Sequence, residues 1–185
     1  MEARAPILRV PIASMRRRVM YERILVALDG SPTSDRALAE AIGLARRLDA
    51  ELVVAHVVDN GFIKYDVGYI DVGGFMELLR EQGKQIVASG LDQAKKAGVR
   101  ARTLLVDDPL ASFDVGLAID AAAREAGAQL LVLGTHGRRG VRRLLLGSVA
   151  ESVARQSSLP VLLVRGVHAE SAERVSEGVT HVVAA

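Results

Sequence analysis

Residues 24–38 decide the fold of this chain, and their sequence is ILVALDGSPTSDRAL. The apolar run Ile24–Leu28 is typical of a β-strand that is buried on both faces. The run ends at Asp29-Gly30, and the next two residues, Ser31 and Pro32, are typical of the N-cap and first turn of a helix. Apolar residues then recur with a helical period at Ala37, Leu38, Ala41, Ile42, Ala45 and Leu48. The stretch therefore predicts a buried strand, a tight turn and an amphipathic helix.

Outward from this stretch, strands and helices alternate as far as residue 164. We expect further strands at Leu52–Val58, Val99–Val106, Leu130–Leu133 and Pro160–Val164. Helical patterns follow at 75–97, 112–126 and 147–156, and Gly98 and Gly127 are expected C-caps of the first two. A longer connection, residues 59–74, precedes the first of these helices. Continuous apolar strands that alternate with helices predict an α/β, doubly wound three-layer fold with a five-stranded parallel sheet.

The charges are distributed unevenly along the chain. Its 185 residues include 24 Lys and Arg and 22 Asp and Glu, which gives a net charge of +2. Residues 1–20 carry a net charge of +4, residues 166–185 carry −2, and residues 21–165 are neutral. Because the basic excess lies in the N-terminal segment, we expect neither nucleic acid nor a membrane surface as a partner.

The same patterns divide the chain into three parts. We expect one folded domain at 21–165, a disordered N-terminal extension at 1–20 and a C-terminal tail at 166–185. The extension is either a transit-type segment or lies upstream of a start at Met20. The absence of cysteine excludes disulfides, cysteine-ligated zinc and a thiol nucleophile, and it fits a cytoplasmic protein. No run of about 18 apolar residues is present, so the sequence predicts no membrane span.

The segment after the fourth predicted strand has the features of a phosphate site. It contains Gly134 and Gly137, whose main chain a ligand can approach closely, and it ends at Gly147-Ser148, where the next helix begins. The N–H groups and the positive dipole end of that helix attract anions. The spacing matches neither of the common glycine-rich phosphate loops. We therefore expect a two-piece phosphate cradle; the alternatives are a simple turn at the glycines and an ordinary capping role for Ser148.

Asp29 ends the first predicted strand, and ligands of open α/β sheets bind where such strands end. A carboxylate there repels phosphate, but it accepts hydrogen bonds from ribose hydroxyls or shares a Mg²⁺ ion. This favours a nucleotide whose sugar lies near Asp29 and whose phosphates lie at the cradle. The alternative is that Asp29 only caps the following helix. The arginines beside the cradle either steer an anion or form a solvated face: Arg138, Arg139, Arg142 and Arg143.

Several of these motifs together resemble one known family. Residues 21–31 resemble the opening of a universal stress protein, and Gly134-x2-Gly137-x9-Gly147-Ser148 matches the G-x2-G-x9-G-[ST] pattern of the ATP-binding members. His56-Val57 late in the second strand and Leu159-Pro160-Val161 before the fifth are also similar. The resemblance covers 21–165. The connection 59–74 is longer than expected, and no glycine directly precedes Pro109, where relatives often have one.

The resemblance implies a sheet order of 3-2-1-4-5, a role in stress responses, and a homodimer. Strand Val161–Val164 is expected at the sheet edge, and a long apolar edge invites pairing with a second chain. The implied ligand is ATP, with Mg²⁺. The implied contacts are Ala27, Asp29, the main chain of Val57, Leu133, Gly134, His136 and Gly137, with Gly147, Ser148 and Val149 at the phosphates.

Three functions are compatible with the sequence. The first is an ATP-binding stress-response regulatory module with at most slow hydrolysis. The second is a phosphoryl or adenylyl transferase, and the third is a nucleotide-free dimerisation protein. Efficient transfer chemistry needs a general base and a metal cluster near the phosphates, whereas Asp29 is the sole carboxylate expected there. We therefore assign no catalytic residue and no protein metal ligand, and we interpret His56 as a packed strand residue without a function.

Overall fold

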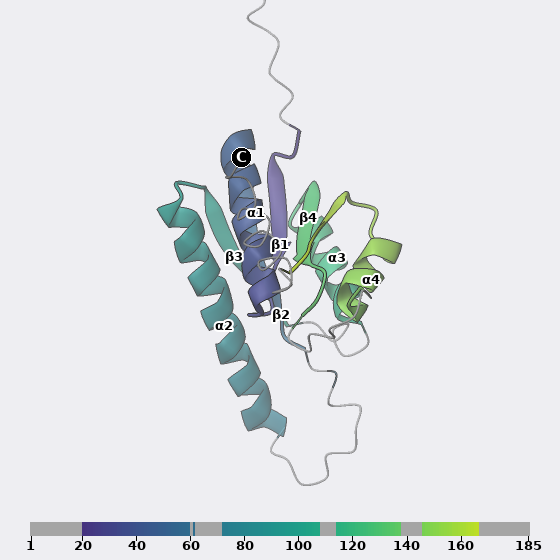
Figure 1. Ribbon diagram of the computed structural model, residues 1–185. Coiled ribbons are helices and arrows are strands. Elements are labelled where there is room, and N and C mark those ends of the chain that lie inside the picture. Colours follow the sequence, from purple (N-terminus) through teal and green to yellow (C-terminus); the bar gives the residue numbers. More distant parts are fainter. Residues whose placement is uncertain (1–19, 60, 62–71, 108–113, 138–145, 167–185) are drawn as a thin grey trace, which may run out of the picture.

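The computed structural model describes residues 20–59, 61, 72–107, 114–137 and 146–166. Its centre is a five-stranded sheet with the order β3-β2-β1-β4-β5 (Figure 1). All neighbouring strands are parallel: β1 (Arg23–Ala27), β2 (Glu51–Val57), β3 (Ala101–Val106), β4 (Leu130–Gly134) and β5 (Val161–Val164). The predicted fold class and strand order are thus confirmed. The order reverses between β1 and β4, so the switch point of the sheet lies between these strands.

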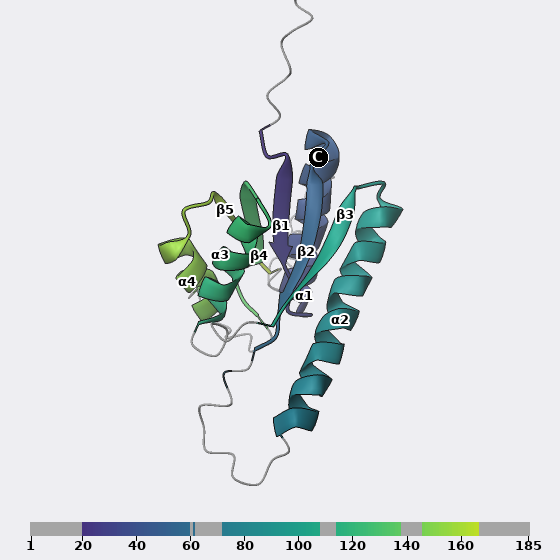
Figure 2. The same ribbon diagram turned by 180° about the vertical axis from the view of Figure 1, so that it is seen from behind.

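Helices cover both faces of the sheet. Helices α1 (Pro32–Leu48) and α2 (Val72–Lys96) lie on one face, and α3 (Val115–Glu125) and α4 (Ser148–Gln156) lie on the other (Figures 1 and 2). Alternate strand residues supply a core cluster under each pair: Ile24 and Val26 pack under α1 and α2, whereas Leu25 packs under α3 and α4. Burial on both faces explains why the strands are continuous apolar runs. Among the described residues, no helix combines the length and apolar character that a membrane span requires.

The turn that follows β1 has the predicted cap. The Ser31 hydroxyl accepts a hydrogen bond from the N–H of Ser34 at 3.2 Å, and Pro32 is the first residue of α1. Oδ1 of Asp29 accepts from the N–H of Ser31 at 3.0 Å. Gly30 between them has a φ of +78°, a value that L side chains rarely adopt. The chain therefore leaves the sheet sharply after Leu28.

Three elements begin two or three residues away from the predicted position, each for a local reason; the other boundaries agree to within about one residue. Helix α3 begins at Val115 rather than near 112, because the Asp114 carboxylate accepts hydrogen bonds from the N–H groups of Gly116 and Leu117 and is the N-cap. Strand β3 begins at Ala101 rather than Val99, because the Val99 N–H bonds the end of α2. Helix α2 begins at 72 rather than 75; its first turn contains two glycines, which weaken the helical pattern.

Two further glycines let α2 lie close to the sheet. A Cβ atom added at Gly83 would lie 2.7 Å from Cδ2 of His56, and one added at Gly90 would lie 2.7 Å from Cγ1 of Val54. Real Cβ atoms are not found this close to such neighbours, so any side chain would push the helix outward. The glycines therefore set the distance between α2 and β2.

This close packing predicts opposite effects of two alanine substitutions. Gly90→Ala should lower the free energy of unfolding by about 1–3 kcal/mol, because the added methyl group overpacks the contact with Val54. Gly43→Ala in α1 is the matched control: nothing lies within 4 Å of the added Cβ. Its better helix propensity should raise the stability by about 1 kcal/mol. Urea unfolding monitored by circular dichroism measures the stability of both variants. If both substitutions stabilise the protein, or both destabilise it, the close packing of α2 at Gly90 is not what determines the effect.

Candidate functional site

The ends of β1 and β4 bring the predicted carboxylate and the predicted glycine loop together. Ala27 and Leu133 are register partners in these strands, so the residues that follow them leave the sheet side by side. A Cβ atom added at Gly137 would lie 2.6 Å from Oδ2 of Asp29. The two oxygens of Asp29 thus have different surroundings: Oδ1 bonds the turn at Ser31, and Oδ2 faces the glycine loop.

The second piece of the cradle is tied to the first by the main chain. The N–H of Gly147 donates to the carbonyl of Thr135 at 2.8 Å, and a Cβ at Gly147 would lie 3.1 Å from that oxygen. Thr135 is buried, and its own N–H donates to the carbonyl of Val164 in β5 at 2.8 Å. The two described ends of the segment between β4 and α4 therefore lie against each other, as a two-piece site requires.

Helix α4 has a glycine as its N-cap, Gly147. Among the described residues, no side chain makes a capping hydrogen bond at this end of the helix. The first helical bond runs from the N–H of Glu151 to the carbonyl of Gly147 at 2.8 Å, so the N–H groups of Ser148 and Val149 precede it. The capping role that the sequence left open for Ser148 is not realised. Its side chain is exposed at the first position of the helix.

The other residues that the sequence predicts at the site differ in whether their main chain or their side chain can reach a ligand. The side chains of Ala27, Val57 and Leu133 all pack in or against the core cluster under α3 and α4, so these residues can offer a ligand mainly their main chain. A Cβ at Gly134 would lie 2.8 Å from Cγ2 of Thr33, so this glycine makes room for the start of α1. Nδ1 of His136 lies 3.0 Å from the Thr135 hydroxyl.

The main chain of Val57 faces the exit of β1. The last hydrogen bond between β1 and β2 runs from the N–H of Leu28 to the carbonyl of Ala55 at 2.8 Å. Main-chain groups of a central parallel strand alternate between its neighbours, and the N–H of Val58 bonds Val106 in β3. The N–H and carbonyl of Val57 therefore point toward the β1 side. Within the described part of the chain, no hydrogen bond takes up the Val57 N–H.

A carboxylate joins the starts of α3 and α4 beside this region. Oδ2 of Asp114 accepts from the Ser152 hydroxyl at 2.7 Å, while Oδ1 accepts from Gly116 at 2.7 Å. Partial burial raises the pKa of the Asp114 carboxyl group, but the hydrogen bonds from Ser152, Gly116, Leu117 and Gln156 together hold that pKa below its ordinary value. The charged form of Asp114 therefore holds the two helices together.

The lowered pKa predicts a pH-dependent effect of Asp114→Asn. A carboxyl group with a lowered folded-state pKa contributes stability above its unfolded-state pKa, and this contribution is lost as the pH falls through the folded-state value. At pH 7 the variant should lose about 1–2 kcal/mol of unfolding free energy, because its amide nitrogen cannot accept from Ser152. The difference from the parent should shrink as the pH falls below about 4. Urea unfolding of both proteins between pH 7 and pH 2.5 measures this difference in stability. A difference that does not change with pH would contradict a stabilising role for the charged form of Asp114.

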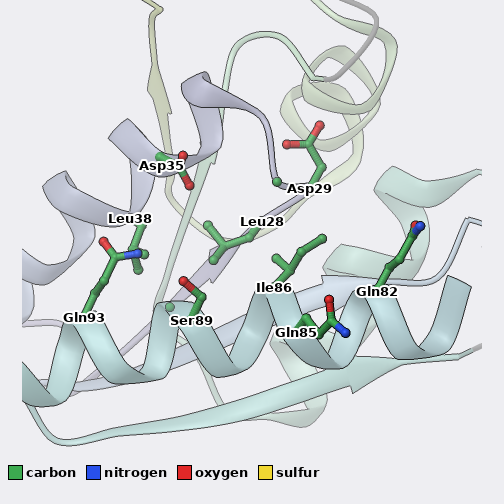
Figure 3. Close-up of a pocket in the computed structure, with 11 residues that line it drawn as sticks. Leu28, Asp29, Asp35, Leu38, Gln82, Gln85, Ile86, Ser89 and Gln93 are labelled. Atoms are coloured by element: carbon green, nitrogen blue, oxygen red, sulfur yellow. The ribbon is translucent and has the colours of Figure 1, made fainter.

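A separate groove of about 400 Å³ lies on the other face of the sheet, between α1 and α2 (Figure 3). Its apolar floor includes Leu28 and Leu38, which belong to the core cluster under α1 and α2, and its α2 wall is lined by Gln82, Gln85, Ile86, Ser89 and Gln93. Figure 3 shows the Asp29 carboxylate pointing away from α2. The groove therefore shares Asp29 with the cradle but lies on the opposite face from Ala27, Val57 and Leu133.

The site also contains features that the sequence interpretation missed. Thr135 ties the loop to β5 and to Gly147, and Asp114 with Ser152 holds α4, but none of them belongs to the motif. In the described residues, no three His, Asp or Glu side chains are grouped as a metal site. The four predicted arginines lie outside the described residues, as do residues 1–19 and 167–185 and most of the connection 59–74.

Comparisons with known proteins agree with the fold. A sequence model of the Universal stress protein family matches residues 20–165. The universal stress protein MJ0531 of Methanocaldococcus jannaschii is 34% identical over 149 residues, which cover 79% of this chain and 83% of that protein. A universal stress protein family structure from Burkholderia pseudomallei has a TM-score of 0.66 and 36% identity, and the match covers 78% of this chain and 96% of that chain. A universal stress protein crystallised in complex with cAMP has a TM-score of 0.53 and 28% identity, over 79% of this chain and 98% of that one.

Proposed function

The chain belongs to the universal stress protein family, a family of stress-response proteins, and we propose that it acts there as an ATP-binding regulatory module of the cytoplasm. The observation that carries the proposal is the meeting of Asp29 with the two-piece glycine cradle at the switch point. A related universal stress protein has been crystallised with cAMP, so an adenine nucleotide is a ligand of at least one relative. The site of this chain has groups suited to each part of such a ligand.

The phosphate groups would lie against Gly137, Gly147 and the start of α4. Main-chain N–H groups suit phosphate oxygens, and at the N-terminus of α4 no described side chain takes up these groups. A side chain at Gly137 or Gly147 would shift the loop, because a Cβ at either position meets Asp29 or Thr135. Glycine at both positions thus keeps the two pieces of the cradle close together.

The sugar and the base would lie on the β1 side of the cradle. Oδ2 of Asp29, which faces the glycine loop, is an acceptor for ribose hydroxyl groups. The N–H and carbonyl of Val57 form an adjacent donor and acceptor, which match the acceptor and donor on the edge of adenine. The apolar side chains of Ala27, Leu133 and Val149 cluster on the same face of the sheet.

A Mg²⁺ ion fits this site together with the phosphates. Mg²⁺ in nucleotide sites is commonly held by one or two carboxylates plus phosphate oxygens, and Asp29 is the carboxylate that lies at the glycine loop. When bound, the ion would neutralise phosphate charge near Asp29. Within the described part of the chain no metal-binding group of three acidic or histidine side chains is present, so phosphate oxygens would complete the coordination.

Binding rather than efficient turnover is the role proposed for the bound nucleotide. Oδ1 of Asp29 accepts a hydrogen bond from the N–H of Ser31 in the turn after β1. This structural role makes Asp29 less suited to act as a general base. Steady-state phosphate release separates the two functions: we expect turnover far below about 1 s⁻¹, the low end for typical enzymes. A faster rate that is abolished together with binding would favour the transferase or hydrolase alternative.

The direct test of the proposal is the nucleotide content of the purified protein. We expect denaturation to release ATP, identified by mass spectrometry, and calorimetric titration of the stripped protein to show ATP binding. Titration with cAMP distinguishes a preference for the cyclic monophosphate from a preference for the triphosphate. Failure to bind any adenine nucleotide at millimolar concentration would refute the proposal and favour the nucleotide-free dimerisation protein.

A further inference from the structure

His56 lies beside the proposed base site, although the sequence interpretation assigned it no function. The residue is 5% exposed and is the next-to-last residue of β2. Its Nδ1 lies 2.7 Å from the carbonyl oxygen of Leu28, the last residue before Asp29. Because a carbonyl oxygen only accepts, Nδ1 carries a proton and donates it to Leu28.

This bond occupies the acceptor that the Val57 N–H would otherwise use. If the ladder between β1 and β2 continued by one step, the Val57 N–H would donate to the Leu28 carbonyl, just as Leu28 donates to Ala55. In the described residues that bond is absent, and the Leu28 carbonyl accepts from His56 instead. The imidazole thus bonds the Leu28 carbonyl at the point where the ladder ends, and the Val57 N–H has no hydrogen bond among the described residues.

The surroundings of His56 hold the ring in this position. A Cβ atom at Gly83 would lie 2.7 Å from Cδ2 of the ring and 3.3 Å from Nε2, so α2 covers the imidazole closely. Leu105 of β3 lies at the same place, with Cδ1 also 2.7 Å from the added Cβ. The ring is thus confined between α2 and the sheet and directed at the exit of β1.

An open N–H on a buried residue requires an acceptor from outside the sheet. Val57 is 7% exposed, and buried main-chain donors are almost always paired, with water or a ligand where the protein offers nothing. A ring nitrogen of an adenine base is such an acceptor. With the ladder continued by one step, the Val57 N–H would bond the Leu28 carbonyl and could not donate to a base.

We propose that His56 is a positioning residue for the nucleotide: by binding the Leu28 carbonyl, it keeps the Val57 main chain available to the base. This inference rests on the proposed function for its ligand. It assigns base recognition and phosphate recognition to separable groups. Loss of His56 should therefore weaken the binding of an adenine nucleotide but not the binding of a phosphate chain without a base.

The test compares His56→Leu with His56→Asn in the full chain. Leucine cannot donate, so the ladder should close; the asparagine amide nitrogen stands at the same number of bonds from Cβ as Nδ1 and should restore the bond to Leu28. Calorimetry is run with ATP and with inorganic tripolyphosphate, which probes the cradle alone. We expect ATP affinity to fall tenfold or more in His56→Leu, to recover to within about threefold in His56→Asn, and tripolyphosphate affinity to change less than twofold.

A second measurement does not depend on the nucleotide. Amide hydrogen exchange by NMR should show the Val57 N–H at least tenfold more protected in His56→Leu than in the parent, since it would then bond Leu28. Unchanged protection, or equal losses of ATP and tripolyphosphate affinity, would overturn the inference. If the parent binds no nucleotide, the proposed function fails, and the exchange rate still decides whether His56 holds the ladder open. If His56→Leu does not fold, His56→Met, which also cannot donate from the side chain, takes its place with the same expected results.

Discussion

Replacing Gly137 with glutamate should lower the affinity of this protein for ATP by roughly a hundredfold or more, equivalent to about 2.7 kcal/mol. The added Cβ would lie 2.6 Å from Oδ2 of Asp29, at the point where the carboxylate faces the glycine loop. A shift of the Asp29 side chain relieves that contact alone, so Gly137→Ala should cost much less. Glutamate adds a second carboxylate beside the first, and both then repel phosphate.

Two further variants make the result specific. Gly147→Glu should show a comparable loss, because its Cβ would lie 3.1 Å from the main-chain carbonyl of Thr135 and its carboxylate would repel phosphate. Ser89→Phe fills the groove between α1 and α2 on the other face and should leave ATP affinity unchanged. Nucleotide released from each purified variant is quantified against the parent, with circular dichroism to verify folding. If both glutamate variants retain as much ATP as the parent, the glycine cradle is not the phosphate-binding site.

In the homodimer that the sequence predicts, a proline at residue 163 should separate the two copies into monomers. Strand β5 is at the edge of the sheet, and the proposed dimer pairs this edge with a second copy. The N–H groups of Leu131 and Thr135 in β4 donate to Pro160 and Val164. By the alternation of a parallel ladder, the Leu162 N–H faces β4 and the Leu163 N–H faces outward. Leu163→Pro thus removes an outward donor but no bond to β4.

Leu162→Pro is the matched control for this prediction, one residue away. It removes a donor to β4, so it should destabilise the fold itself rather than the pairing of copies. Sedimentation velocity gives the oligomeric state, and thermal unfolding gives the stability. A dimeric Leu163→Pro variant, or a parent that is monomeric at micromolar concentration, would exclude β5 as the dimer interface.

The fold could be predicted because local signals and tertiary structure agree in this chain. The run Ile24–Leu28 is buried on both faces, and Ser31 caps α1 as its position indicated. The glycine motif correctly predicted that the segments near Asp29, Gly137 and Gly147 come together, since the order of β1 and β4 in a doubly wound sheet requires it. Their contact with a nucleotide remains a prediction.

Contacts between distant residues could not be predicted in the same way. Gly83 and Gly90 were unremarkable within a helical pattern, yet they set the distance of α2 from the sheet. His56 is indistinguishable in sequence from any buried strand residue, because its bond to Leu28 depends on where β1 stops. Gly134 carries part of the motif, but its closest neighbour is Thr33 of α1. Such roles depend on three-dimensional proximity, which a single sequence does not contain.

The hydrogen bond from Thr135 to Val164 has a consequence for how the two proposed interactions communicate. It joins the first residue beyond β4 in the glycine loop to the last residue of the edge strand, so one main-chain hydrogen bond connects the two regions directly. A displacement of β5 on association would reach the loop without passing through any flexible side chain. Thermodynamic linkage is reciprocal: if association tightens the loop around nucleotide by some factor, nucleotide strengthens association by the same factor. Occupancy of the site would then report on the concentration of the protein as well as on that of its ligand.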